Sequence, residues 1–469
     1  MLPEEYINAS ERERQLWVDT LPIEVGMQYF GGKSGPLGRK LLKAVCDMQA
    51  YCITRGERKK IYVDAFCGGG KMGLSVPEGW FDEIYMNDLD YGVYSYYHVC
   101  KENPEELKKI VEAYINPKTL IQKVKITNDL EKSQGWLLFE ALKWGRHSDE
   151  GMFGANYNYK GAVGVNLEAI DNEEALKTNS VIEKVFSDIK NITIPEPELR
   201  AAFATVFITE YGFTSETGKH ASYTIEGKRE TEKVGLINQK KKDILNKIDN
   251  VNRIMNKKNI TITRDDYAQL LDTPSEQAEA EMINNSRKDL LHLAENKDNI
   301  LFFLDPPYHP LTLSGQKEAG YDCTFNREMS LQILDKLRKL KDEEKKMAFI
   351  FCNYNPSDFK AANEELFNDE EKNKEALKGL DLTGARYEKK EIEEIEANKV
   401  IIKNLFPNEA DDIFNARMEG KLSYEDFTPF QNLGIAEPYY LGAFQRLDSS
   451  TSKGNEIIWI QPNYCEGNK

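Results

Sequence analysis

Four short apolar runs constrain the fold of this chain more than any other feature. They are KKIYVDAF (59–66), EIYMNDLD (83–90), NILFFLDPPY (299–308) and KMAFIFCNYN (346–355). Continuous apolar runs of this length are typical of strands covered on both faces, as in parallel sheets. Helical patterns lie between them, for example from Pro36 to Gly56, which has a proline start and a glycine end. This alternation predicts an α/β protein with a doubly wound, Rossmann-like parallel sheet.

Two long stretches interrupt the alternation. The strand-like signals stop near residue 105 and resume near residue 260, and the tyrosines, glycines and basic residues between them predict an inserted domain. A second, helical insert is predicted from about 360 to 430, where EELFNDEEKNKEAL and EKKEIEEIEANK are charged and contain few apolar residues.

Composition excludes several classes of protein. The chain has 469 residues and no apolar run long enough to span a membrane, and its first residues, MLPEEYINASERER, do not resemble a signal peptide. The seven cysteines form no CxxC pair and the five histidines form no HExxH motif, so neither a metal site nor a disulfide framework is predicted. We expect a cytoplasmic protein with reduced cysteines, no membrane association and no metal.

The charge of the chain is unevenly distributed. The net charge of the chain is −16, yet the segment from Lys219 to Arg264 contains 12 basic residues and 5 acidic ones. A solvated helix face is the simpler explanation of such a lysine run. A basic segment confined to one part of an acidic protein also suits a nucleic-acid contact. The candidate DNA-binding residues are Lys228, Arg229, Lys240, Lys241, Lys242, Lys257 and Lys258.

A glycine-rich turn follows the first strand. In DAFCGGGKMG, Gly68, Gly70 and Gly73 satisfy the spacing GxGxxG, and Asp88 ends the next strand. Such a turn lets the backbone approach a ligand, and the acid can accept hydrogen bonds from ribose hydroxyls. The pattern fits a nicotinamide cofactor as well as other adenosine-containing cofactors, and a purely structural glycine turn is a further alternative.

The tetrapeptide DPPY ends the third strand. Asp305 and Pro306 each precede a proline, which favours extended backbone and leaves their carbonyl groups outside a helical ladder. A carboxylate and a carbonyl can then accept two hydrogen bonds from one amino group, and Tyr308 offers a surface for a flat base. A rigid proline turn with Tyr308 in a packing role is the structural alternative.

The segment YFGGKSG (29–35) suggests a phosphate-binding P-loop at first sight. That loop requires a glycine five residues before Gly32, but this position is Met27 and Gly26 is one residue out of register. The sequence therefore disfavours a P-loop, and Lys33 needs another explanation.

These motifs together resemble the Dam-like, alpha-group DNA N6-adenine methyltransferases. YFGGK (29–33), FCGGG (66–70), NDLD (87–90) and DPPY (305–308) occur in the order of that family. ITITRDDYAQLL resembles the family's Asp-Phe turn, FIFCNYN its Ser-Asn strand end, and NEIIWIQPNY its closing strand. The resemblance covers about half of the chain. The family's middle-domain motifs survive only as a loose outline in residues 199–223, so no recognition sequence is predicted.

The resemblance implies S-adenosylmethionine as cofactor, double-stranded DNA as partner, and a monomer encoded by a bacterium or phage. It cannot indicate whether a restriction endonuclease accompanies the protein. The implied catalytic residues are Asp305, Pro306, Pro307, Tyr308, Lys33 and Asn353. The implied cofactor-binding residues are Tyr29, Phe30, Gly31, Gly32, Lys33, Asp64, Phe66, Cys67, Gly68, Gly69, Gly70, Asp88, Asp266, Tyr267 and Asp305.

The resemblance also divides the chain. The expected parts are a cofactor-binding part (24–110), a target-recognition domain (111–257), a DPPY part (258–359), a charged helical insert (360–430) and closing strands (431–469).

The expected reaction transfers a methyl group to the 6-amino group of an adenine flipped out of the duplex. Asp305 and the Pro306 carbonyl would accept the two amine hydrogens and stabilise positive charge on nitrogen, while Tyr308 stacks on the base. A cytosine N4-methyltransferase, an RNA adenine methyltransferase, a nicotinamide oxidoreductase and a catalytically silent DNA-binding protein remain as alternatives.

Overall fold

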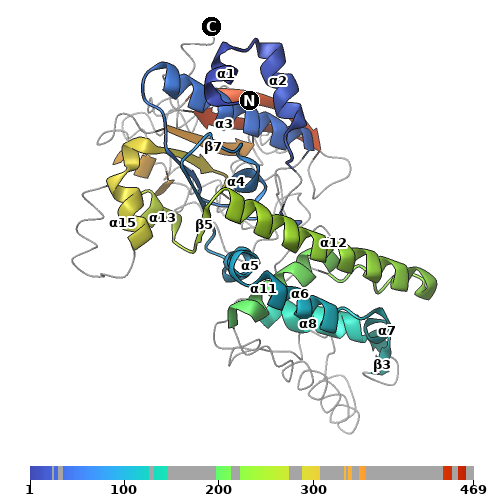
Figure 1. Cartoon of the computed structure of the whole chain (residues 1–469). Coiled ribbons are helices and arrows are strands. Elements are labelled where there is room, and N and C mark those ends of the chain that lie inside the picture. Colours follow the sequence, from blue (N-terminus) through green and yellow to red (C-terminus); the bar gives the residue numbers. More distant parts are fainter. Residues whose placement is uncertain are drawn as a thin grey trace, which may run out of the picture.

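The computed structural model describes thirteen segments of the chain, shown as coloured ribbon in Figure 1. They are residues 1–23, 26–29, 35–125, 131–145, 197–212, 222–273, 288–306, 332–333, 336–337, 339–340, 348–354, 437–445 and 453–460. The expected insert at 360–430 lies outside the described residues.

A seven-stranded mixed sheet forms the centre of the described structure. Its strands are β1 (Ile61–Asp64), β2 (Glu83–Asn87), β5 (Ile260–Thr263), β6 (Ile300–Leu304), β7 (Ala348–Tyr354), β8 (Glu437–Gln445) and β9 (Lys453–Ile460). Their order is β5-β2-β1-β6-β7-β9-β8. The first five pair in parallel, and β9 runs antiparallel to both of its neighbours. The α/β class and the parallel sheet agree with the sequence prediction and are compatible with a Rossmann-like fold.

The sheet is covered on both faces, as the apolar runs predict. Side chains alternate along a strand, so Tyr62 joins one apolar cluster while its neighbours Ile61 and Val63 join another. The first cluster includes helices α3 (Gly35–Thr54) and α4 (Lys71–Ser75). The second includes α13 (Tyr267–Leu270) and α15 (Lys288–Glu295). Figure 1 shows α3 and α15 on different sides of the strands.

A group of helices lies between β2 and β5 in the sequence and extends away from the sheet (Figure 1). It comprises α5 (Tyr91–Glu102), α6 (Pro104–Tyr114), α7 (Pro117–Leu120), α8 (Gln134–Gly145), α11 (Pro197–Tyr211) and α12 (Glu230–Lys257), with a small hairpin of β3 (Lys123–Lys125) and β4 (Glu131–Ser133). Every residue of α11 from Ala201 to Tyr211 is buried. The boundary expected at 110/111 falls inside α6, which packs on α11 and α12.

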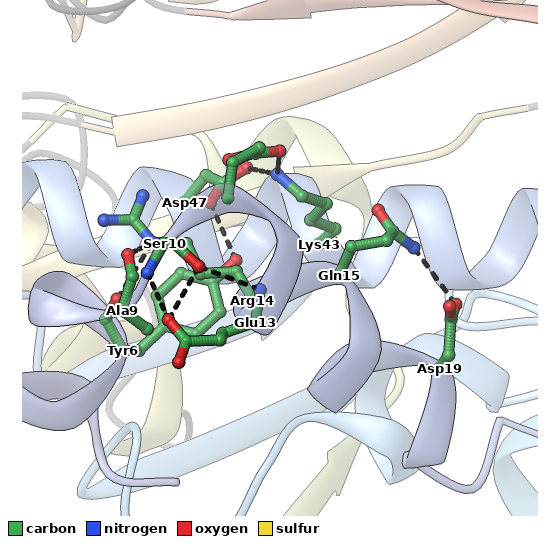
Figure 2. Close-up of polar contacts among 10 residues, drawn as sticks. Tyr6, Ala9, Ser10, Glu13, Arg14, Gln15, Asp19, Lys43 and Asp47 are labelled. Carbon is green, nitrogen blue, oxygen red and sulfur yellow. Dashed lines mark hydrogen bonds and ion pairs between the residues drawn. The ribbon is translucent and has the colours of Figure 1, made fainter.

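Two N-terminal helices, α1 (Pro3–Asn8) and α2 (Glu11–Thr20), pack on α3. Figure 2 shows the polar contacts between them. The Tyr6 hydroxyl donates a hydrogen bond to Asp47 at 2.7 Å, and Lys43 pairs with the other oxygen of Asp47 at 2.6 Å. Ser10 and Glu13 form a capping box at the start of α2. The N-terminal helices are therefore anchored to the helix that covers the sheet.

Within the described part of the chain, no helix is both long and apolar enough to cross a membrane.

Candidate functional site

Three acidic residues follow or end neighbouring strands at one edge of the sheet. Asp64 ends β1, Asp88 follows β2 and Asp305 follows β6. The strand order reverses between β1 and β6, because β2 and β5 extend to one side of β1 while β6 and β7 extend to the other. Ligands of open α/β sheets bind outside the carboxyl ends of the strands at such a point. The predicted glycine turn and the start of DPPY therefore lie where a ligand is expected.

The glycine turn after β1 adopts a conformation that favours glycine. Gly68 and Gly70 have φ angles of +45° and +66°, in the left-handed region. The Gly70 N–H donates to the Cys67 carbonyl at 2.6 Å, and the Cys67 N–H donates to the Asn87 carbonyl at 2.8 Å. A tight turn is thus fixed against the end of β2.

Two acidic side chains hold the glycine turn through its backbone. Asp88 Oδ2 accepts a hydrogen bond from the Gly68 N–H at 2.8 Å. Asp64 Oδ2 accepts one from the Gly73 N–H at 3.0 Å, in the first turn of α4. These two N–H groups are therefore directed at acidic side chains of the protein itself.

The surroundings of Asp64 disfavour its negative charge. Burial raises the pKa of Asp64 to about 8, the Gly73 N–H opposes this rise, and the negative charges of Asp305 and Asp88 add to it. Asp64 is 1% exposed. Its carboxyl group is therefore largely protonated at neutral pH, and a positive charge placed nearby favours its ionisation.

Residues 26–29, which lead into the Gly-Gly-Lys segment, pack on the glycine turn. A Cβ atom added to Gly68 would lie 3.1 Å from the Tyr29 ring, and one added to Gly26 would lie 2.3 Å from the Gly69 carbonyl oxygen. Gly26 also has a φ of +114°. Tyr29 thus lies beside the glycine turn.

The turn after β5 contacts the residues that follow β1. Asp266 caps α13 by accepting the Ala268 N–H at 2.8 Å. The adjacent Tyr267 ring packs on Phe66, with ring centroids 5.4 Å apart. The structure therefore brings Asp266 and Tyr267 next to the residues after β1.

Several expected site residues cannot be placed. Asn353 belongs to β7 and pairs with Ile457 of β9, but its side chain lies outside the description. Six others lie outside the described residues: Phe30, Gly31, Gly32, Lys33, Pro307 and Tyr308.

The candidate DNA-binding residues have different surroundings. Lys240 donates to the Glu210 carbonyl oxygen and lies over the Tyr211 ring, and burial lowers its pKa. Lys258 donates to the Leu74 and Val76 carbonyl oxygens, both at 2.6 Å, and burial lowers its pKa to about 8.

The other candidates lie nearer the surface. Lys241 donates to the Glu112 carbonyl at 3.0 Å, and Lys257 pairs with Glu78 at 2.5 Å. Lys228, Arg229 and Lys242 are exposed. The lysine run is therefore divided between internal contacts and surface positions.

Asn87 is a residue that the list of site candidates missed. It is 1% exposed, and its side chain forms hydrogen bonds with residues after β1 and at the end of β5. The signal in the sequence was a polar residue that closes an otherwise apolar strand.

Comparison of the chain with protein-family models and with curated proteins found no match in either case. Among the described residues, no group of His, Cys, Asp and Glu side chains is arranged to hold a metal ion. The proposal that follows therefore depends on the motifs and on the geometry of the carboxyl edge.

Proposed function

We propose that this protein is an S-adenosylmethionine-dependent DNA methyltransferase that modifies the 6-amino group of adenine. The observation that carries the proposal is the use of two glycine-turn N–H groups by Asp88 and Asp64. A dinucleotide-binding turn presents its backbone to a pyrophosphate, which is negatively charged. Here acidic side chains occupy that side of the turn, and a nearby positive charge favours the ionised form of Asp64. A cationic sulfonium compound therefore suits this edge better than a pyrophosphate does.

The proposed cofactor suits the residues present. Asp88 accepts the Gly68 N–H through one oxygen and the Asp90 N–H through the other, and a carboxylate has further lone pairs for ribose hydroxyls. Asp64 would become ionised beside a cation. S-adenosylmethionine supplies an electrophilic methyl group when bound. Tyr29, Phe66 and Tyr267 would supply apolar and aromatic surface around its adenosine part.

The sheet order supports a methyltransferase sheet over an ordinary dinucleotide-binding sheet. With the strands of the large sheet renumbered from 1 to 7, the order is 3-2-1-4-5-7-6. The first five positions match those of the doubly wound order 3-2-1-4-5-6. The last strand, β9, lies between β7 and β8 and runs antiparallel to both. A late strand that closes the sheet is what the family resemblance implies for residues 431–469.

Asp305 and Pro306 would act on the target amine. The Asp305 carboxylate and the Pro306 carbonyl accept hydrogen bonds from the two N–H groups of this amine. These bonds favour a pyramidal nitrogen with an available lone pair. Positive charge then develops beside a carboxylate that is already in place, which stabilises the transition state without reorganisation. The adenine must leave the base stack to reach this edge, and Tyr308 would stack on it.

The helices between β2 and β5 would hold the duplex as an inserted target-recognition region. The exposed basic candidates there are Lys228, Arg229, Lys242 and Lys257, the last of which pairs with Glu78. Lys240 and Lys258 form internal hydrogen bonds. Exposed lysines and arginines can neutralise DNA phosphates. A cytosine amine or an RNA adenine could use the same acceptor pair, and both remain chemical alternatives.

Calorimetry with purified protein tests the cofactor. S-adenosylmethionine and S-adenosylhomocysteine should bind, and NAD and NADP should not. Binding of a nicotinamide cofactor with no binding of S-adenosylmethionine would instead support an oxidoreductase and sink the proposal.

A further inference from the structure

The side-chain amide of Asn87, at the carboxyl edge of the sheet, forms hydrogen bonds through all of its donor and acceptor positions. Its Nδ2 group donates to the carbonyl oxygens of Ala65 and Asp265, both at 3.0 Å. Its Oδ1 atom accepts the Asp265 N–H and the Thr263 hydroxyl, both at 2.8 Å. An asparagine offers two N–H donors and one oxygen with two lone pairs. All four positions are therefore satisfied within the protein.

The partners of Asn87 belong to the connections that carry the proposed cofactor residues. Ala65 directly precedes Phe66 and the glycine turn, and Asp265 directly precedes Asp266. Asn87 itself directly precedes Asp88. One buried amide thus connects the ends of β1, β2 and β5.

The strand ladder alone does not hold these connections together. The register of β1 with β2 ends at Asp64 paired with Met86, and that of β2 with β5 ends at Asn87 paired with Thr263. Beyond these pairs, the Cys67 N–H donates to the Asn87 carbonyl oxygen at 2.8 Å, and the Asp88 N–H donates to the Thr263 carbonyl oxygen at 3.2 Å. The Asn87 side chain adds four more bonds where the ladder stops.

We propose that Asn87 is a positioning residue that fixes the glycine turn, Asp88 and the Asp266 turn relative to one another before a ligand binds. It touches no ligand itself and acts through the residues that do. The identity of the ligand rests on the proposed function, whereas the ordering of the turns does not. A preorganised site loses less conformational entropy on binding, so disorder among these turns weakens affinity.

The chemistry of this position requires an amide. Aspartate has nearly the same shape, but a carboxylate oxygen would face the carbonyl oxygens of Ala65 and Asp265 in place of two donors. It would also add negative charge beside Asp64 and Asp88. Asn87→Asp therefore changes the hydrogen bonding while leaving the packed volume almost unchanged.

The test is Asn87→Asp with two measurements. Amide hydrogen exchange without ligand reports the order of residues 66–70 and 265–267, and calorimetry reports the dissociation constant for S-adenosylmethionine. We expect faster exchange in both turns and a dissociation constant raised by about tenfold or more, since two hydrogen bonds become repulsive contacts.

Gln49 provides a matched control at the other end of β1. It is 0% exposed, and its side-chain amide donates to the Lys59 and Trp80 carbonyl oxygens at 2.6 and 2.9 Å. Gln49→Glu makes the same chemical change before the strand begins. It should lower stability but leave exchange at 66–70 and 265–267 close to that of the wild type.

Thr263 provides a milder variant if Asn87→Asp does not fold. Thr263→Val removes only the hydroxyl that donates to Asn87, while Thr263→Ser keeps it. Thr263→Val should raise the dissociation constant severalfold and speed exchange at 265–267, whereas Thr263→Ser should resemble the wild type.

Two results would overturn the inference. One is unchanged exchange in both turns of a folded Asn87→Asp or Thr263→Val protein. The other is an equal increase of amide exchange at residues 66–70 and 265–267 in Gln49→Glu. That result would mean that Asn87→Asp acts only by lowering the overall stability. If the wild type binds no S-adenosylmethionine, the proposed function fails, and the exchange measurement still decides the role of Asn87.

Discussion

Asp88 Oδ2 accepts the backbone N–H of Gly68 at 2.8 Å, and this bond joins the end of β2 to the glycine turn after β1. The residue that is expected to bind ribose hydroxyls thus also holds the turn in place. These two roles of Asp88 can be separated because they depend on different properties. Strong ligand binding requires the negative charge, whereas the bond from Gly68 requires only an acceptor atom.

Replacing Asp88 separates these roles. Asp88→Asn keeps an oxygen acceptor for Gly68 but loses the charge, and Asp88→Ala loses both. We expect the dissociation constant for S-adenosylmethionine to rise by about tenfold in Asp88→Ala and by a smaller factor in Asp88→Asn. Calorimetry measures both. Wild-type affinity in Asp88→Ala would remove this residue from the cofactor site.

The raised pKa of Asp64 gives a pH prediction. The folded pKa of about 8 lies above the ordinary value of 3.8. Asp64 therefore favours the folded state below about pH 4, and this contribution is lost as pH rises to about 8. A cationic ligand prefers the ionised form, so S-adenosylmethionine should bind more tightly as pH rises towards 8, by up to about tenfold per unit.

Two controls test this pH effect: the uncharged-sulfur ligand S-adenosylhomocysteine and the variant Asp64→Asn. S-adenosylhomocysteine lacks the sulfonium charge and should show a weaker pH dependence in calorimetry between pH 6 and 9. Asp64→Asn keeps an acceptor for the Gly73 N–H but cannot ionise, so it should flatten the difference between the two ligands. The same difference in Asp64→Asn would show that another group is responsible.

Two neighbouring lysines on α12 test the location of DNA contacts. Lys242 is exposed, whereas Lys240 donates to the Glu210 carbonyl. Lys242→Ala should make the slope of log affinity against log salt shallower by about 0.9, the value for one phosphate contact. Lys240→Met should leave that slope unchanged. Fluorescence anisotropy on one duplex measures both, and an unchanged slope in Lys242→Ala would place the DNA elsewhere.

The N-terminal helices provide a stability prediction. Tyr6→Phe removes the hydroxyl bound to Asp47 and should lower the free energy of unfolding by about 1.5 to 3 kcal/mol, the range for a hydrogen bond to a charged group. Tyr51→Phe is the control, because the Tyr51 hydroxyl accepts a hydrogen bond from Arg55 that is exposed to solvent. Urea unfolding should show a much smaller effect there. Equal effects would mean that the Tyr6 contact adds no stability.

The sequence predicted the central strands because burial on both faces leaves a continuous apolar run. The runs at 59–66 and 83–90 contain β1 and β2, and those at 299–308 and 346–355 contain β6 and β7. The acids at the ends of β1 and β2 were equally readable, since polar residues after an apolar strand lie at the carboxyl edge.

The long-range partners of polar residues were not readable from the sequence. Lys258 lies in a basic run, and its partners Leu74 and Val76 are far away in the chain. Helix α11 was also missed as a helix, because a segment buried all round has no polar face and hence no helical periodicity. The four bonds of Asn87 likewise depend on strands that meet only in the folded chain.

The central claim is methyl transfer to adenine, and its most direct test is modification-sensitive sequencing of DNA from cells that express the protein. We predict N6-methyladenine at one defined sequence in cells with the wild type. We predict none with Asp305→Ala, although the purified variant should still bind S-adenosylmethionine because the glycine turn and Asp88 are intact. Absence of methyladenine with a well-expressed wild type, or undiminished methylation by Asp305→Ala, would contradict the account.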